Sequence, residues 1–222
     1  MYTFIFDTTG AGCNVILLKD ETIMSSFSQR MDFGQSETLI PAIKSLLSSH
    51  NICFDDLNFL FVCTGPGSFT GVRSSISAAR VFALAKPQIK VSGISAFEGY
   101  IQSLDMSEIS ETNAVIIETR REDFYVQIFD KNLQKLGEPK ALSRQDIITK
   151  LKEGGKMVTL VGDGVERFLA QPSGLCLHAI KMCDTLPLNG LAKACLKAIS
   201  SRRLNYPKPL YLRAPDVSVP KS

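Results

Sequence analysis

Apolar and polar positions along the first ninety residues follow a pattern typical of an α/β protein. Runs rich in aromatic and β-branched residues predict strands over 2–6, 13–18 and 22–27. Apolar residues at helical spacing then predict a helix over 36–49, and an unbroken apolar run predicts a strand over 57–63. A second helix over 70–86, stopped by Pro87, and a strand over 89–92 complete this part. The predicted order is βββαβα followed by a strand.

The pattern restarts after the polar stretch 105–113. Ser95 and Glu98 have the spacing of a capping box and predict a helix start just before that stretch. Beyond it we expect strands over 114–118 and 124–129, a helix over 143–152, a strand over 157–161 and a last helix over 187–203.

The two parts carry similar signals at similar places. Asp7 ends the first strand, and Gly65-Pro66-Gly67 follows a later strand; Glu118 and Gly162-Asp163-Gly164 take those places in the second part. This predicts an internal duplication of βββαβα units in two lobes. We expect lobes at 1–104 and 105–213, with the last helix able to return to the first lobe, and a frayed tail at 214–222.

Composition supports a folded protein of one large domain or two small lobes. The 222 residues are 45% hydrophobic and 21% charged. No apolar run reaches the roughly 20 residues that a membrane span needs, and the start lacks a signal-peptide pattern, so we expect a cytoplasmic protein without a membrane segment. A net charge of +3 is too small to decide whether nucleic acid is a partner.

The six cysteines and two histidines point away from metal chemistry. No cysteine pair has C-x-x-C spacing, so reduced, mostly buried thiols are expected rather than a zinc site. His50 and His178 lie far apart, and neither has a second histidine three or four residues away. We also find no G-x-S-x-G nucleophile elbow, and therefore expect no catalytic residue.

The block Gly65 to Arg73 is the densest chemical signal. A glycine-rich turn before a helix offers free backbone N–H groups and the positive end of the helix dipole, which suit phosphate. The spacing excludes a Walker A loop and a dinucleotide fingerprint. A tight turn in which glycines merely permit close backbone approach remains an equal alternative. The candidate phosphate-binding residues here are Gly65, Pro66, Gly67, Ser68 and Thr70.

A second candidate element is Asp7-Thr8-Thr9 at the end of the first strand. Asp7 is placed to hold Mg²⁺ through water while Thr8, Thr9 and backbone amides face a phosphate. The alternative is that these residues cap a turn.

Several motifs together resemble one family. F-D-T-T, S-E-T-L-I-P-A-I-K-S-L-L, G-P-G-S-F-T-G-V-R, I-S-A-F-E, E-T-R and P-L-Y-L-R occur in this order over about residues 1 to 213. This order resembles the TsaB family of bacterial tRNA threonylcarbamoyladenosine biosynthesis proteins. Glu118-Thr119-Arg120 departs from the family's more frequent Asp-Ala-Arg, which puts a phosphate or metal contact of the second lobe in doubt.

The resemblance implies a two-lobed actin/Hsp70-like (ribonuclease H-like) α/β fold and a non-catalytic role. It implies a heterodimer with a catalytic TsaD-like paralogue, whose His-x-x-x-His motif is absent here, as well as a TsaE-like ATPase and tRNA bound through the complex. A homodimer of the isolated chain is a further option. No cofactor is required on this view, although weak binding of ATP or ADP with magnesium is compatible with it.

Two other readings come from the enzyme class. One is a free-standing ATPase or small-molecule kinase of the same fold, which Asp7 and the glycine-rich turn favour and the short second lobe opposes. The other is an M22-type peptidase, against which the missing histidine pair argues.

Helical periodicity predicts where a partner docks. On the helix over 70–86 one apolar stripe holds Val72, Ile76, Ala79 and Ala83, and a second holds Gly71, Ala78, Phe82 and Ala85. A surface helix normally buries one stripe, so we expect a partner on the second, extended by Ser74 and by a flank of the neighbouring helix, namely Ala42, Ser45 and Ser49. The alternative is that both stripes are covered within the chain.

Overall fold

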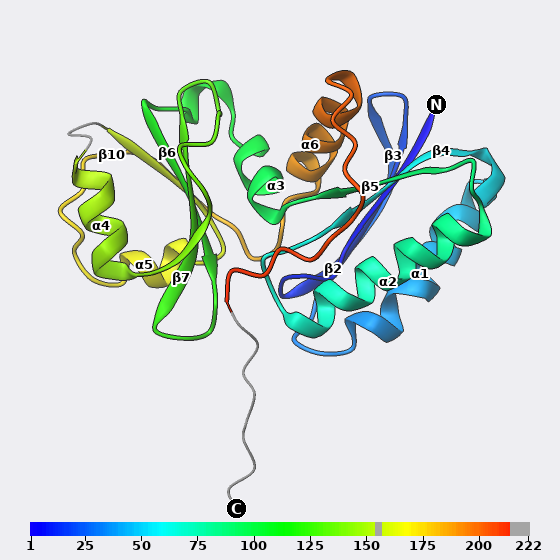
Figure 1. The fold of residues 1–222 in the computed structure, drawn as a ribbon, viewed down its shortest axis with the longest axis horizontal. Coiled ribbons are helices and arrows are strands. Elements are labelled where there is room, and N and C mark those ends of the chain that lie inside the picture. Colours follow the sequence, from blue (N-terminus) through cyan, green and yellow to red (C-terminus); the bar gives the residue numbers. More distant parts are fainter. Residues whose placement is uncertain (154–156, 214–222) are drawn as a thin grey trace, which may run out of the picture.

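Two five-stranded sheets form the frame of the molecule in the computed structural model, which describes residues 1–153 and 157–213. The first sheet has the order β3-β2-β1-β4-β5, and the second has the order β10-β9-β6-β7-β8 (Figure 1). The strands of the first sheet are β1 (Tyr2–Asp7), β2 (Gly12–Lys19), β3 (Thr22–Arg30), β4 (Leu57–Cys63) and β5 (Lys90–Ile94). Those of the second are β6 (Thr112–Glu118), β7 (Asp123–Asp130), β8 (Lys140–Ser143), β9 (Val158–Gly162) and β10 (Leu177–Met182).

The chain is a duplication, as predicted. Both halves run βββαβαβα, and in both the first strand pairs antiparallel with the second and parallel with the fourth. The helices are α1 (Gln35–Ser49), α2 (Phe69–Ala85), α3 (Ala96–Gln102), α4 (Arg144–Glu153), α5 (Val165–Leu169) and α6 (Leu188–Ser200). The sequence pattern missed β8, α5 and β10, because the first two are short and β10 is a half-exposed edge strand.

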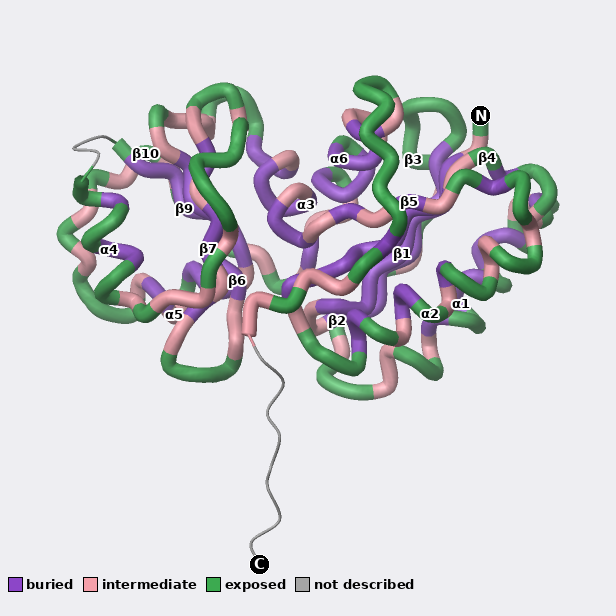
Figure 2. Tube along the Cα trace, in the orientation of Figure 1, coloured by how far each residue is buried: buried purple, intermediate pink, exposed green. Residues whose placement is uncertain are grey.

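Helices and sheets alternate in five layers (Figure 1). Helices α1 and α2 cover the outer face of the first sheet, and α4 and α5 cover that of the second. Helices α3 and α6, the last of each repeat, lie between the sheets in one apolar cluster with both of them. Figure 2 shows this buried material as continuous purple strands and inner helix faces. One core therefore joins the two lobes.

Helix α6 returns from the second lobe to pack on the first, beside α3, β2 and β5. A Cβ atom on Gly190 of α6 would overlap the carbonyl oxygen of Gly99 in α3, so both helices approach at a point free of side chains. The predicted boundary at residue 105 falls in the link between the repeats, and the predicted tail at 214–222 lies outside the described residues.

Residues 203–213, named here the C-terminal strap, run in extended form along the edge of the first sheet (Figure 1). The Gly93 N–H donates to the Asn205 carbonyl at 2.8 Å, and the Leu210 N–H donates to the Thr64 carbonyl at 2.8 Å. At its end Arg213 forms an ion pair with Asp123 of the second lobe. The strap thus covers the β5 edge and connects both lobes.

The predictions for the helix cap and for the cysteines can be compared with the structure. The capping box at Ser95 and Glu98 is present: Glu98 N–H donates to the Ser95 hydroxyl at 3.2 Å, and Ser95 N–H donates to the Glu98 carboxylate at 2.9 Å. All six cysteines are free, but Cys53 and Cys176 are exposed rather than buried. Within the described ranges, every helix is too short or too polar to cross a bilayer.

Candidate functional site in the cleft between the lobes

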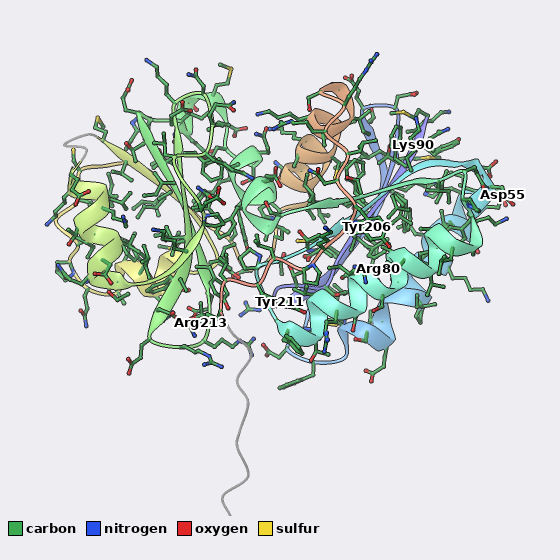
Figure 3. The ribbon with its side chains drawn as sticks, in the orientation of Figure 1. Asp55, Arg80, Lys90, Tyr206, Tyr211 and Arg213 are labelled. Atoms are coloured by element: carbon green, nitrogen blue, oxygen red, sulfur yellow. The ribbon has the colours of Figure 1, made fainter. Side chains whose placement is uncertain are left out.

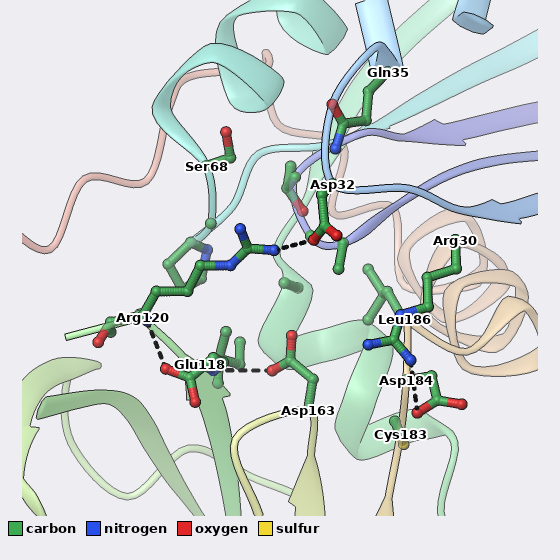
Figure 4. A pocket seen from close by; sticks show the side chains of 18 of the residues that line it. Arg30, Asp32, Gln35, Ser68, Glu118, Arg120, Asp163, Cys183, Asp184 and Leu186 are labelled. Atoms are coloured by element: carbon green, nitrogen blue, oxygen red, sulfur yellow. Dashed lines mark hydrogen bonds and ion pairs between the residues drawn. The ribbon is translucent and has the colours of Figure 1, made fainter. Parts of the chain in front are cut away.

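A cleft of about 650 Å³ lies between the lobes (Figure 4). Five of the eight predicted phosphate-binding residues line it, namely Thr9, Pro66, Gly67, Ser68 and Thr70. The other three, Asp7, Thr8 and Gly65, are buried behind it. The structure therefore brings the two predicted elements together, but only some residues of each element face the cleft.

The two elements meet backbone to backbone. The Ser68 N–H donates to the Thr9 carbonyl at 2.7 Å. A Cβ atom on Gly67 would overlap this Thr9 carbonyl, and one on Gly71 would overlap the carbonyl of Thr8. Both glycines are therefore required by close approach, as the alternative reading of the glycine-rich turn proposes.

The Asp7 carboxylate is used inside the protein. One oxygen accepts hydrogen bonds from the Thr9 N–H at 2.8 Å and the Thr9 hydroxyl at 2.6 Å, and the other accepts from the Asn14 amide at 3.2 Å. Asp7 is 1% exposed, and burial raises its pKa despite these hydrogen bonds. The Thr8 hydroxyl likewise donates to the Gly71 carbonyl at 2.8 Å. Asp7 does not fit the role of a water-mediated magnesium ligand in this conformation.

The second lobe repeats this arrangement. Gly162 and Gly164 press against the backbone of Ile116 to Glu118 so closely that a Cβ atom on Gly162 would overlap the Ile116 carbonyl. Both Glu118 oxygens accept from Arg167, at 2.6 and 2.8 Å. Burial raises the pKa of Glu118, but these hydrogen bonds outweigh it and leave the pKa below its ordinary value. Each strand-end carboxylate thus has a structural partner.

Acidic groups dominate the cleft wall. The charged lining residues are Arg30, Asp32, Glu37, Glu118, Arg120, Asp163, Glu166 and Asp184. Both arginines are paired across the cleft (Figure 4): Arg120 with Asp32 at 2.6 Å, and Arg30 with Asp184 at 3.6 Å. A polyphosphate would meet an excess of like charge here. Ser68 and Thr70, exposed at the start of α2, are the lining residues that suit an anion, and their role stays a prediction.

Asp163 is a cleft residue whose environment the sequence did not reveal. It sits in the Gly-Asp-Gly turn after β9, accepts from the Glu118 N–H at 2.9 Å and is hydrogen-bonded to Tyr100 of α3. Burial raises the pKa of Asp163 from 3.8 to about 6. Burial, followed by the charge of Asp163, raises the pKa of Tyr100 well above its usual value. This pair joins the second lobe to the central helix layer.

Part of the predicted partner surface is buried within the protein. Two of its residues, Ala42 and Gly71, are therefore not available to a partner. Ala42 is 8% exposed and belongs to the apolar cluster under α1, while Gly71 faces the Thr8 carbonyl. Ala78 and Phe82 also pack on that cluster, and Ser74 is half-buried. Helical periodicity reveals apolar stripes but not the neighbour that covers each one. The exposed members of the predicted surface are Ser45, Ser49 and Ala85.

Two exposed apolar residues of α2 were missing from the prediction. Leu84 is 82% exposed and Val81 is 61% exposed, and Ile40 of α1 is 50% exposed. The position of Val81 and Leu84 beside the polar residues of the helix could have identified both as exposed. The histidines stay apart: the His178 ring bonds the Ser107 carbonyl, and His50 caps α1. Within the described ranges, no three His, Cys, Asp or Glu side chains form a group that could hold a metal.

Comparison with known sequences identifies the family of this chain. The family model described as "TsaD: tRNA N6-adenosine threonylcarbamoyltransferase" matches residues 34–214. The chain is 26% identical over 165 residues to the tRNA threonylcarbamoyladenosine biosynthesis protein TsaB of Bacillus subtilis, covering 73% of this chain and 71% of the relative. It is 24% identical to TsaB of Escherichia coli, covering 96% and 95%.

The chain is a TsaB member of the TsaD family. Solved structures agree on the fold of this TsaB chain: YeaZ from Pseudomonas aeruginosa superposes with a TM-score of 0.80 at 20% identity, covering 95% of this chain and 99% of that one. A ROK hexokinase from Thermus thermophilus superposes with a TM-score of 0.50 at 10% identity, covering 91% and 100%. The predicted two-lobed actin/Hsp70-like fold is confirmed.

The close approach at Gly67 predicts a large effect of a single methyl group. Gly67→Ala forces the Thr9 carbonyl to move, so we expect the free energy of unfolding of the TsaB chain to fall by about 1–3 kcal/mol or more. Gly10→Ala in the adjacent loop is the matched control, because a Cβ there meets nothing within 4 Å. Thermal and urea unfolding measure both; equal effects would contradict the packing role of Gly67.

The raised pKa of Asp163, a half-buried residue, predicts a pH-dependent stability. Its folded pKa of about 6 exceeds 3.8, so the folded state binds more protons between about pH 4 and 6. The free energy of unfolding therefore falls as the pH rises through this window and stays at the lower value above it. Asp163→Asn should therefore stabilise the TsaB chain by about 2–3 kcal/mol at pH 7, with no gain near pH 4. Glu166→Gln, on an exposed cleft carboxylate, is the control in urea unfolding at several pH values; a gain independent of pH would contradict this origin.

Proposed function

We propose that this chain is a non-catalytic subunit in the formation of threonylcarbamoyladenosine at adenosine 37 of tRNA. It pairs as a heterodimer with a catalytic TsaD-like paralogue in the cytoplasm, and a TsaE-like ATPase and tRNA join through that complex. Membership of the TsaD family and the TsaB names of the relatives support this pathway. The observation that carries the subunit role is the exposure of the apolar side chains of Val81 and Leu84 on α2.

The proposed docking surface consists of Ile40, Val81, Leu84 and Ala85. Leu84 leaves four-fifths of its surface in water, although burying a leucine side chain contributes about 1.5–3 kcal/mol. The opposite side of α2 is already occupied, with Phe82 stacked on Phe54 at 4.5 Å between ring centroids. A partner helix laid over the outer side would cover Val81 and Leu84 without disturbing this core. A second copy of the chain is the alternative occupant.

The cleft chemistry supports a role other than turnover. Asp7 and Glu118, the carboxylates best placed at strand ends to act in the cleft, are held by Thr9, Asn14 and Arg167. A free-standing ATPase or kinase would need such a group facing its substrate. The fold alone, shared with the ROK hexokinase, does not assign a reaction. Any ATP or ADP bound in this cleft would be held weakly, by Ser68 and Thr70 at the start of α2.

Placing a charge on the docking surface should separate the subunits. Leu84→Glu would leave a carboxylate buried against an apolar partner, so we expect the association to weaken by about 2 kcal/mol or more while the isolated chain keeps its melting temperature. Leu136→Glu, on a 53% exposed leucine of the second lobe, is the matched control. Co-elution with the TsaD-like subunit in size-exclusion chromatography measures the effect. Loss of pairing with both variants, or with neither, would contradict the assignment.

Because Ala42 is buried, a charge at this position tests the core of the first lobe and not the docking surface. Ala42→Glu would place a charge in the core beneath α1, so we expect unfolding rather than selective loss of the partner. Circular dichroism of the isolated variant distinguishes the two results.

The chain alone should not modify tRNA. We would incubate it with threonine, bicarbonate, ATP and unmodified tRNA, and digest the RNA to nucleosides for mass spectrometry. Threonylcarbamoyladenosine should appear when the TsaD-like and TsaE-like proteins and the enzyme that supplies threonylcarbamoyl-adenylate are added, and not before. Product formed by this chain without the TsaD-like protein, or ATP turnover by the isolated chain at the rate of a working kinase, would refute the non-catalytic role.

A further inference from the structure

Charge is distributed very unevenly along this chain. No Asp or Glu occurs between Leu57 and Phe97, or between Thr185 and Arg213. These two acid-free segments carry 10 of the 25 Lys and Arg residues, so the remaining residues hold 15 cations and all 22 acidic side chains. The net charge of +3 therefore conceals a basic part and an acidic part.

The fold lays the two acid-free segments side by side. The first contains α2 and β5, and the second ends in the C-terminal strap, which runs between them. Arg80 of α2 donates to the Pro207 carbonyl of the strap at 3.1 Å, and the β5 edge bonds the strap through Asn205. Figure 3 labels Lys90, Tyr206, Arg80 and Tyr211 along this path. The exposed cations of this surface, named here the basic strip, are Arg73, Arg80, Lys90, Arg203 and Lys208.

Exposed aromatic rings are interleaved with these cations. Phe69 stacks on Tyr211 with centroids 5.5 Å apart and planes 28° apart, and the Arg73 guanidinium lies 4.5 Å from the Phe69 centroid. The Arg80 guanidinium lies 5.4 Å from the centroid of Tyr206. Tyr206 is 59% exposed, and Phe69 and Tyr211 are each 47% exposed. These rings are held in place but keep open surface.

We propose that the basic strip binds RNA directly, at a segment with unpaired bases. Arg73, Arg203 and Lys208 would contact phosphates, and bases would stack on the open surface of Tyr206 and Tyr211. Fixed rings between cations are the combination that binds single strands, because phosphates need positive charge and every base has a flat face to stack. A surface without acidic groups from its own segments also favours a polyanion over most proteins.

This contact goes beyond the proposed function, in which tRNA joins through the complex. It borders the docking surface on α2, since Leu84 points only about 40° around the helix from Arg80 while Val81 points about 100° from it. The RNA contact is measurable on the isolated chain, so its failure and that of the pairing are separate results.

The test uses the full chain, a fluorescein-labelled RNA hairpin with an unpaired loop, and a duplex of the same number of nucleotides. Fluorescence anisotropy at several salt concentrations gives the affinity and its salt dependence. The double variant Arg73→Glu, Lys208→Glu should bind the hairpin about tenfold more weakly or worse, with a salt slope reduced by about 2. Tyr206→Ala should lose about fivefold or more and keep the slope of the unchanged chain.

The double variant Lys150→Glu, Lys152→Glu provides the matched charge control, because both lysines are exposed on α4 in the second lobe. It should bind the hairpin as the unchanged chain does, and circular dichroism confirms that every variant is folded. The proposal is overturned if Lys150→Glu, Lys152→Glu weakens binding as much as Arg73→Glu, Lys208→Glu, if Tyr206→Ala has no effect, or if the duplex binds as tightly as the hairpin. Loss of the TsaD-like subunit from Arg73→Glu, Lys208→Glu, with no hairpin binding by the unchanged chain, would instead assign the strip to a protein partner.

Discussion

Contact between bare backbones holds each lobe together where it borders the cleft. In the first lobe Gly67 and Gly71 lie against the carbonyls of Thr9 and Thr8, and in the second Gly162 lies against that of Ile116. No side chain fits at these points, so the turn after the fourth strand and the end of the first strand become one rigid unit. These two joints fix the strand ends beside the cleft.

These two backbone contacts also determine which carboxylates face the cleft. Because the strand ends are pressed inward, Asp7 is closed off behind Thr9 and Glu118 is paired with Arg167. The remaining wall carries acidic groups and is bridged between the lobes by Arg120 and Asp32. The surfaces that we propose for binding therefore lie outside the cleft, on α2 and along the strap.

Most of this architecture could be predicted from the sequence, and the exceptions share a cause. The recurrence of an acidic strand end and a Gly-x-Gly turn predicted the duplication, because both signals depend on neighbours close in the chain. Ala42, β10 and the acidic surroundings of Asp163 could not be predicted in the same way. Each depends on which distant element packs against it, and a single helix or strand pattern contains no such information.

The return of α6 and the strap to the first lobe has a consequence for synthesis. The first lobe is made first on the ribosome, but its central helix layer lacks α6 and its β5 edge stays unpaired until α6 and the strap are translated. During this interval the nascent chain exposes a strand edge and an apolar sheet face. Translation of α6 and the strap then completes the packing of the first lobe, so a chain that stops before α6 would be prone to aggregate rather than form a shortened working protein.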